Sequence, residues 1–151
     1  MHPPRFLVDS TAVRLSRWLR FMGLDVSLDS SESVARLLLR ARREGRVLLT
    51  RRRELAGARE AVLLTSDHLD EQLRQVGTAY KLAVESASRC TVCNAELVVV
   101  PRVNADGRVP EFIYQSHRKF AFCKRCDRYY WKGTHWKNVR DASARMSDTD
   151  R

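Results

Sequence analysis

The fold is decided by the stretch Arg5-Phe6-Leu7-Val8-Asp9-Ser10-Thr11, in which a short apolar run leads directly into polar residues. An unbroken apolar run of this length predicts a strand that is buried on both faces. The hydroxyl of Ser10 or Thr11 can cap a helix that starts just after it, and Gly23 is expected to end that helix. The apolar face of this helix is predicted from the helical spacing of Leu15, Leu19 and Met22, with Trp18 beside them.

The succession of strand and helix continues to about residue 80. Alternating or short apolar runs predict further strands at residues 24–28, 47–49 and 61–64. Helices are expected between and after them: one with Val34, Leu37, Leu38 and Ala41 on its apolar face, a short one at residues 53–58, and a last one with Leu69, Leu73, Val76 and Tyr80, capped by Ser66 or Asp67. This alternation predicts an α/β fold: a mainly parallel sheet with flanking helices on both faces.

The four cysteines form two pairs with the spacing of metal-binding knuckles, Cys90-Thr91-Val92-Cys93 and Cys123-Lys124-Arg125-Cys126. Four thiolates suit a tetrahedral structural Zn²⁺ and leave no open coordination position for catalysis. The 29 residues between the pairs are expected to form a hairpin, with strands at 97–100 and 112–114 and a turn at 104–107. We therefore predict a small β zinc ribbon over residues 87–140. Disulfides or a redox-active pair are the less favoured alternatives.

Composition excludes several classes of protein. The 151 residues are 44% hydrophobic and 30% charged, which is globular composition, and no apolar run is long enough to span a membrane. The first residues lack the apolar core of a secretory signal, so we expect a cytoplasmic protein with no membrane partner. Of the 28 basic residues 23 are Arg, and the net charge of +10 predicts an anionic partner, RNA or single-stranded nucleic acid.

Polar residues follow each predicted strand and should meet at one edge of the sheet. Asp9 follows the first strand, Asp29 and Glu32 the second, and Asp67 the fourth. Acids gathered there would bind Mg²⁺ or Mn²⁺ and activate water for phosphodiester cleavage, although such acids also serve as helix caps and turn residues. Thr50-Arg51-Arg52-Arg53 follows the third strand. Its guanidinium groups would repel a divalent cation and attract phosphate, unless they form a solvated turn.

These motifs together resemble a known family, the Mut-seven C-terminal ribonuclease domain, over about residues 5–140. The resemblance rests on Phe6-Leu7-Val8-Asp9, on Gly45-Arg46-Val47-Leu48-Leu49-Thr50-Arg51, and on the second cysteine pair followed by Tyr130-Trp131-Lys132-Gly133-Thr134-His135-Trp136. It implies a PIN-like fold for residues 1–86, metal-dependent RNA cleavage and a ribbon that helps to hold nucleic acid. Residues 141–151 are expected to form a loosely ordered tail.

The resemblance carries over position by position. Asp9 matches the first acid of the family, and Asp67 falls near its last acidic position. The acidic pair that opens the family's second helix falls on Ser33 and Val34, and Arg52 stands where the family has an acid after its third strand. Two acid positions of the implied nuclease site are therefore not acidic in this chain.

Three functions follow as hypotheses. The first is an RNA-binding protein on a PIN-like ribonuclease scaffold whose nuclease site is degraded. The second is an active ribonuclease that uses Mg²⁺ or Mn²⁺ with Asp9, Asp67 and a displaced carboxylate, Glu32 or Asp29. The third is a structural subunit of a ribonucleoprotein. The residues expected to contact nucleic acid are Arg14, Arg17, Arg20, Arg51, Arg52, Arg53, Trp131, Lys132, His135 and Trp136; the two tryptophans could instead be core residues of the ribbon.

Overall fold

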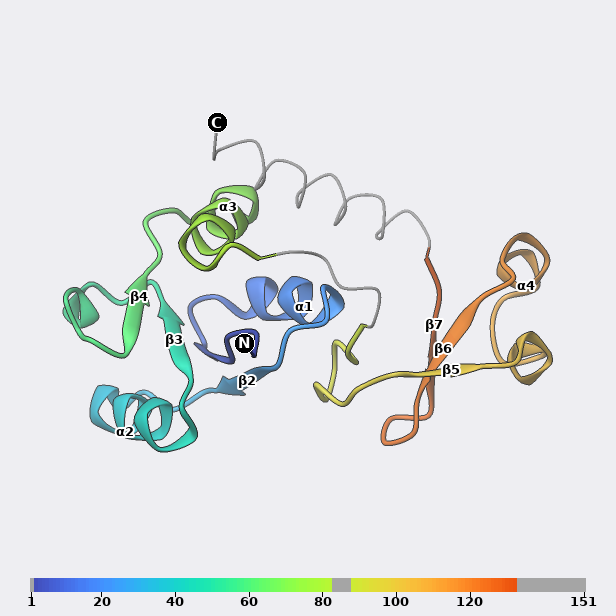
Figure 1. Cartoon of the computed structure of the whole chain (residues 1–151), viewed down its shortest axis with the longest axis horizontal. Coiled ribbons are helices and arrows are strands. Elements are labelled where there is room, and N and C mark those ends of the chain that lie inside the picture. The colour runs from blue at the N-terminus through green and yellow to red at the C-terminus, as the bar shows by residue number, and fades with distance from the viewer. Residues whose placement is uncertain (1, 83–87, 133–151) are drawn as a thin grey trace.

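A computed structural model describes residues 2–82 and 88–132 of the chain (Figure 1). Its larger sheet has four parallel strands in the order β2-β1-β3-β4. The strands are β1 (Phe6–Asp9), β2 (Val26–Asp29), β3 (Val47–Thr50) and β4 (Ala61–Leu63). The prediction of an α/β fold with a parallel sheet is confirmed. All four strands end at the same edge, which is called the carboxyl edge below.

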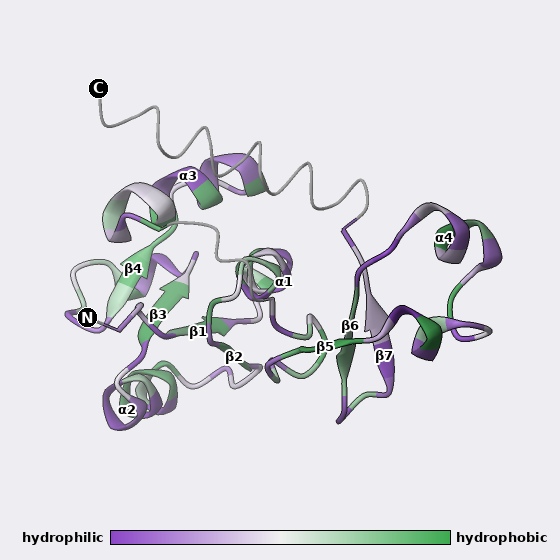
Figure 2. Ribbon diagram, turned by 45° about the vertical axis from the view of Figure 1, so that its right-hand side comes forward, coloured by the Kyte–Doolittle hydropathy of each residue, from purple (hydrophilic) through white to green (hydrophobic). Residues whose placement is uncertain are grey.

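Helices cover both faces of this sheet because successive residues of a strand point to opposite sides. Phe6 and Val8 of β1 pack in one core with α1 (Val13–Phe21) and α3 (Leu69–Tyr80), whereas Leu7 packs in a second core with α2 (Val34–Glu44). Figure 2 shows hydrophobic strands between helices that carry hydrophilic stretches on their outer sides. The buried strands therefore need no polar face.

The helix ends differ in part from the sequence expectations. Ser33 caps α2 by accepting from the backbone N–H of Arg36, and Gly45 ends it with a φ of 64°. α1 and α3 have no side-chain cap: Ala12 and His68 occupy the cap positions. The expected caps were therefore wrong, since the Thr11 hydroxyl bonds Asp9 and the Ser66 hydroxyl accepts from the N–H of His68. The helix expected at 53–58 is the short 3-10 turn η1 (Arg53–Leu55).

The cysteine module contains a small antiparallel sheet in the order β5-β6-β7. Its strands are β5 (Val98–Val100), β6 (Phe120–Cys123) and β7 (Arg128–Tyr130), and β5 is followed by the 3-10 turn η2 (Arg102–Ala105). The strand expected at 112–114 is wrong, because helix α4 (Glu111–Ser116) lies there and β6 pairs with β5 instead. The N–H groups of Ile113 and Tyr114 bond the carbonyl of Pro110, which starts the helical turn.

None of the helices in the described part of the chain is both long and apolar enough to cross a bilayer. The boundary predicted between residues 86 and 87 falls within residues 83–87, which lie outside the described residues, and so does the tail at 141–151. The proposed division into two domains and a tail therefore stays a prediction.

Candidate functional site

Asp9 lies at the carboxyl edge, completely buried at the end of β1. Its Oδ1 accepts from both the N–H, at 2.9 Å, and the hydroxyl of Thr11. Its Oδ2 accepts from the hydroxyl of Thr50 and lies 3.2 Å from Nε of Arg52. Both carboxylate oxygens are therefore occupied by groups of the protein itself.

Arg52 fills the space beside Asp9, and only 15% of its side chain is exposed. Its Nη1 donates to the carbonyl of Glu32 at 2.9 Å, and its Nη2 donates to that of Ser31 at 3.4 Å. Each guanidinium nitrogen thus has a partner in the protein, and the side chain braces the ends of β1 and β3 against the loop before α2. The prediction of Arg52 as a phosphate contact is corrected accordingly: its donors face inward.

The other acids of this edge stand apart from Asp9. Asp29 is paired with Asp9 in the strand register, but its carboxylate accepts from the N–H of Ser31 and forms an ion pair with Arg40 at 2.9 Å. Burial raises the pKa of Asp29, and these bonds lower it by more, so the group stays ionised. Glu32 is exposed, and so is Asp67, which lies 3.6 Å from its neighbour His68. Among the described residues, these acids do not form a metal-binding cluster.

Four arginines around the same edge are exposed, and their guanidinium groups have no hydrogen bond or ion pair within the described ranges. Arg14 and Arg17 lie on the first turns of α1, and Arg51 and Arg53 follow β3. Arg20 is different: it is buried, and its guanidinium donates to the carbonyls of Val26, Thr91 and Val92 at 2.9, 3.0 and 3.2 Å. Arg20 is therefore a structural residue, and the prediction that it contacts nucleic acid is corrected.

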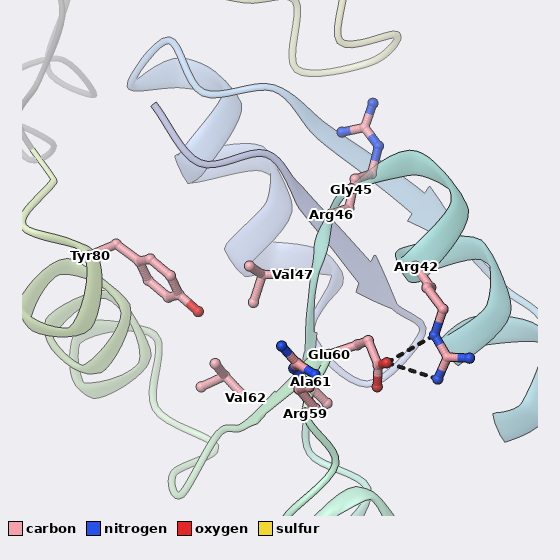
Figure 3. A pocket seen from close by; sticks show the side chains of 9 residues that line it. All are labelled: Arg42, Gly45, Arg46, Val47, Arg59, Glu60, Ala61, Val62 and Tyr80. Atoms are coloured by element: carbon pink, nitrogen blue, oxygen red, sulfur yellow. Dashed lines mark hydrogen bonds and ion pairs between the residues drawn. The ribbon is translucent and has the colours of Figure 1, made fainter. Parts of the chain in front are cut away.

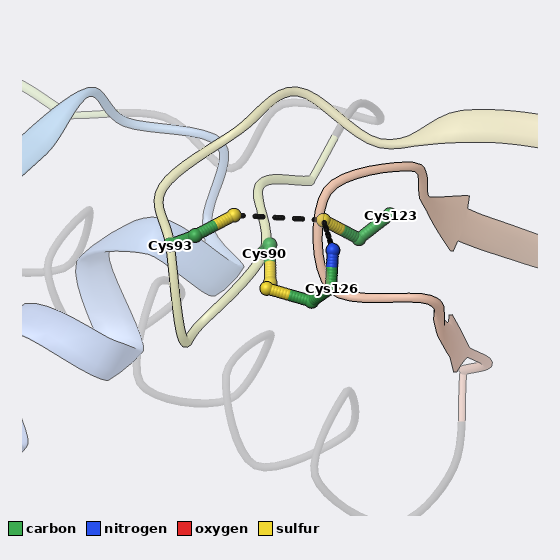
Figure 4. A group of neighbouring side chains, drawn as sticks. All are labelled: Cys90, Cys93, Cys123 and Cys126. Atoms are coloured by element: carbon green, nitrogen blue, oxygen red, sulfur yellow. Dashed lines mark hydrogen bonds between the residues drawn. The ribbon is translucent and has the colours of Figure 1, made fainter.

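The cysteines come together as the sequence predicts (Figure 4). The Sγ atoms of Cys90, Cys93, Cys123 and Cys126 all lie within 4.8 Å of one another, and those of Cys93 and Cys123 are 3.5 Å apart. A tetrahedral ion with ligand distances of about 2.3 Å holds its sulfur atoms roughly 3.8 Å apart. The four thiols therefore fit a single metal ion.

The surroundings of the thiols assist their ionisation at one end of the cluster. Burial raises the pKa of Cys90, but a hydrogen bond with the Tyr130 hydroxyl and two backbone N–H groups lower it to about 6. Hydrogen bonding to Cys93 instead raises the pKa of Cys126 to about 12. The Cys90 thiolate therefore forms near neutral pH, and a metal ion that binds here must displace the proton of Cys126.

The first knuckle is docked on the α/β part through Asn94, a residue whose role the sequence did not reveal. Its side chain accepts from the N–H of Val26 at 2.9 Å and donates to the carboxylate of Asp25 at 2.7 Å. Asn94 has a φ of 71°, a conformation that Asn tolerates better than most residues. An Asn directly after the second cysteine of a knuckle is the signal that could have identified it.

The aromatic residues of the ribbon are partly packed against one another. Trp131 is half-buried, with ring centroids 6.4 Å from Phe120 and 6.5 Å from His117. These contacts support the core role that the sequence left open for Trp131. Lys132 is exposed, and His135 and Trp136 lie outside the described residues.

Comparison with known proteins gives one match. Searches of curated proteins and of solved structures found nothing similar to the chain. The model of the Mut7-C RNAse domain family matches residues 4–143, which include the parallel sheet, the Asp9 edge and all four cysteines. The chain therefore belongs to the Mut7-C RNAse domain family.

Proposed function

We propose that this protein binds single-stranded RNA along the carboxyl edge and the ribbon without cleaving it. The observation that carries the proposal is the Arg52 guanidinium beside Asp9, 3.2 Å from its Oδ2. In a metal-dependent nuclease this place would be held by a divalent cation among carboxylates. Here a side-chain cation neutralises Asp9, the acid that is buried at this edge.

Arg52 opposes a metal ion in two ways. It occupies Asp9 Oδ2 together with Thr50, so a cation would have to displace existing hydrogen bonds. It also repels the cation, by about 3 kcal/mol per unit charge at roughly 6 Å and an effective dielectric of about 20. That repulsion alone lowers metal affinity by at least about a hundredfold.

The free arginines supply the phosphate contacts. Arg51 and Arg53 lie at the carboxyl edge, and Arg14 and Arg17 continue from it along α1. At about 1.5 Å per residue, α1 leads from this edge toward the knuckle that docks beside Arg20. An RNA single strand that follows α1 would pass from the edge of the sheet to exposed basic side chains of the ribbon, such as that of Lys132.

The metal assigned to the four cysteines is Zn²⁺, one ion per chain with a structural role. The support is the all-thiolate ligand set and its spacing, which leave no position open for water or substrate. The PIN-like domain and the ribbon would then act together, the first holding phosphates and the second held in shape by its metal.

A working ribonuclease is the second candidate, and the strand register favours it. Asp9 and Asp29 are partners on adjacent strands, so an acidic residue neighbours the first acid of the family in the sheet, although its carboxylate is paired with Arg40. With Asp67 and Glu32 moving inward, these acids would bind Mg²⁺ or Mn²⁺. Cleavage would then require Arg52 to leave its three protein partners.

The test combines metal binding with RNA cleavage and binding. Wild-type protein should bind a single-stranded fluorescent RNA and leave it intact in Mn²⁺, with a log–log salt slope of roughly −4 if about six phosphates are neutralised. Replacing Arg51 and Arg53 with Ala should reduce the slope by about 1.4. Arg43→Ala, an exposed residue at the other end of α2, should leave the slope unchanged.

The matched pair Arg52→Asp and Arg53→Asp isolates the metal site. Both make the same charge change one residue apart, but only Arg52 touches Asp9. Arg52→Asp should raise Mn²⁺ affinity about a hundredfold and Arg53→Asp much less, with folding verified by circular dichroism. Wild-type cleavage that disappears in Asp9→Asn would overturn the proposal in favour of the ribonuclease.

A further inference from the structure

A cavity of about 510 Å³ opens at the edge where β3 and β4 begin, opposite the carboxyl edge (Figure 3). The ends of α2 and α3 lie beside it, since helices run back against parallel strands. Its apolar wall consists of Val47, Ala61 and Val62. Its volume falls in the range of sites that hold small molecules.

The charged residues of the cavity are not equivalent. Arg42 donates twice to Oε1 of Glu60, at 2.8 and 3.0 Å. Arg46 extends away from the cavity, where it pairs with Asp25 and Glu44. Arg59 has no hydrogen bond or ion pair in the described part of the chain and is exposed. Within the described residues, the cavity therefore offers Arg59 as a free cation.

Glu60 offers an acceptor beside that cation. The bonds from Arg42 lower the pKa of Glu60, so its carboxylate is ionised. Both of these bonds end on Oε1, so Oε2 is the oxygen that can still accept from a ligand with N–H donors, beside the backbone N–H of Glu60 that also bonds the carboxylate.

Tyr80 adds an aromatic boundary with a polar tip. Its ring meets that of Phe6 edge to face, with centroids 5.3 Å apart, and its hydroxyl points into the cavity. Burial raises the pKa of Tyr80, so the hydroxyl stays protonated and can donate. A planar ligand can thus lie against Tyr80 and Val62 while its polar groups reach both charges.

We propose that this cavity binds a nucleotide, with its phosphate on Arg59 and its base against Val62 and Tyr80, donating N–H groups to Glu60. Guanine suits this arrangement among the common bases, because its adjacent N1–H and exocyclic N–H donors can both be aimed at Oε2 of Glu60, the oxygen that Arg42 leaves open. The site lies at the opposite edge from the RNA surface proposed above and does not depend on it. The nucleotide could be free or be the phosphorylated terminus of an RNA, which presents the same groups.

The experiment is calorimetric titration of the full chain with GMP, AMP, UMP, guanosine and inorganic phosphate. GMP should bind most tightly, and guanosine and phosphate should each bind at least about tenfold more weakly. Arg59→Ala should weaken GMP binding by about tenfold, because it removes a charge-assisted hydrogen bond. Arg74→Ala, an exposed arginine on α3 outside the cavity, should leave GMP binding unchanged.

Further experiments distinguish a free nucleotide from the terminus of an RNA, and binding in the cavity from binding on the RNA surface. A linear oligonucleotide with a terminal phosphate that competes with GMP identifies an RNA end, whereas competition by mononucleotides alone identifies a free nucleotide. Circular RNA should bind Arg59→Ala as it binds wild type, so that loss of the cavity is not confused with loss of the RNA surface. Glu60→Gln should reduce the preference for GMP over AMP. Absence of nucleotide binding, or GMP binding that is unaffected in Arg59→Ala, would overturn the proposal.

Discussion

At the scale of single residues, the partners of an arginine decide what it does. Arg20 and Arg52 are enclosed by carbonyls and a carboxylate and act as braces. Arg17 and Arg53 have the same chemistry, yet they are exposed and free to meet phosphate. Burying a guanidinium is costly unless its donors are satisfied, so the backbone carbonyls that surround it determine its role.

Asp25 provides a pH test of one such pairing. Burial raises the pKa of Asp25, and the bonds from Arg46 and Asn94 lower it by more, to below its ordinary value. The ionised form therefore stabilises the fold above about pH 4, and this contribution is lost as pH falls through the lower folded pKa. Asp25→Asn should be less stable at pH 7, by about 1–3 kcal/mol, and should lose less stability on acidification.

Urea unfolding between pH 3 and 7 measures both effects. Asp106→Asn is the matched control, because Asp106 is exposed in the ribbon and its carboxylate has no bond within the described residues. Equal acid sensitivity in wild type and Asp25→Asn would contradict the assigned role.

The sequence predicts which of these residues can bind metal or phosphate, but it does not predict all of the groups that surround them. Asp9 and the four cysteines could be located from short local patterns. Arg17 and Arg20 could not be distinguished, because they lie three residues apart on one helix. The difference arises from the carbonyl of Thr91, which is 71 residues away from Arg20 in the chain.

At the scale of elements, the thiol cluster supplements the small hydrophobic core in the described part of the ribbon. Few side chains in the described part of the ribbon are fully buried, and two of them are the cysteines Cys90 and Cys123. In such a small module the free energy of metal binding is also free energy of folding. The strands of the ribbon should therefore depend on the metal more than those of the parallel sheet do.

Cys123→Ser tests this dependence. Zinc content should fall from one ion per chain to nearly none, and amide protons of β5, β6 and β7 should lose protection from exchange. Those of β1 and β3 should stay protected, since their core contains no ligand residue. Elemental analysis and hydrogen exchange provide the readouts, with Thr91→Ser as the control within a knuckle. Stoichiometric zinc in Cys123→Ser would contradict the four-thiolate site.

The order of elements could be predicted in the α/β part, where hydrophobic periods are clear, and only partly in the ribbon. Residues 112–114 are apolar and aromatic, which suits a strand, but they form part of α4. Arg102 secures this helix by donating to the carbonyls of Tyr114 and His117. That contact joins two segments of the stretch between the cysteine pairs, and no local sequence pattern reveals it.

At the scale of the whole molecule, the two sheets are connected by polar contacts at the first knuckle. Arg20 reaches the knuckle carbonyls, and Asn94 reaches Asp25 and the N–H of Val26. Burial lowers the pKa of Arg20, while the charges of Cys90 and Cys93 raise it. Thiolates bound to a metal would strengthen that attraction, so metal binding and docking should support each other.

Arg20→Ala should therefore weaken both the docking of the first knuckle and the binding of the metal. It removes three hydrogen bonds to buried or partly buried carbonyls, and we expect the free energy of unfolding to fall by about 3 kcal/mol. Zinc affinity should fall as well, measured by competition with a chromogenic chelator. Arg17→Ala, on the same helix but exposed, should change stability by less than about 0.5 kcal/mol. Unchanged zinc affinity in Arg20→Ala would show that docking and metal binding are independent.

The separation of the two cysteine pairs in the sequence also means that the ribosome makes the second pair some time after the first. The parallel sheet and the first knuckle are complete in sequence once Asn94 has been added, but the second pair ends only at Cys126. At about 5–20 residues per second, the ribosome needs roughly two to six seconds to make the intervening stretch. Half of the metal site is thus made before the other half, and we expect the first knuckle, once it has left the ribosome and docked against α1, to be the template on which the later cysteines close.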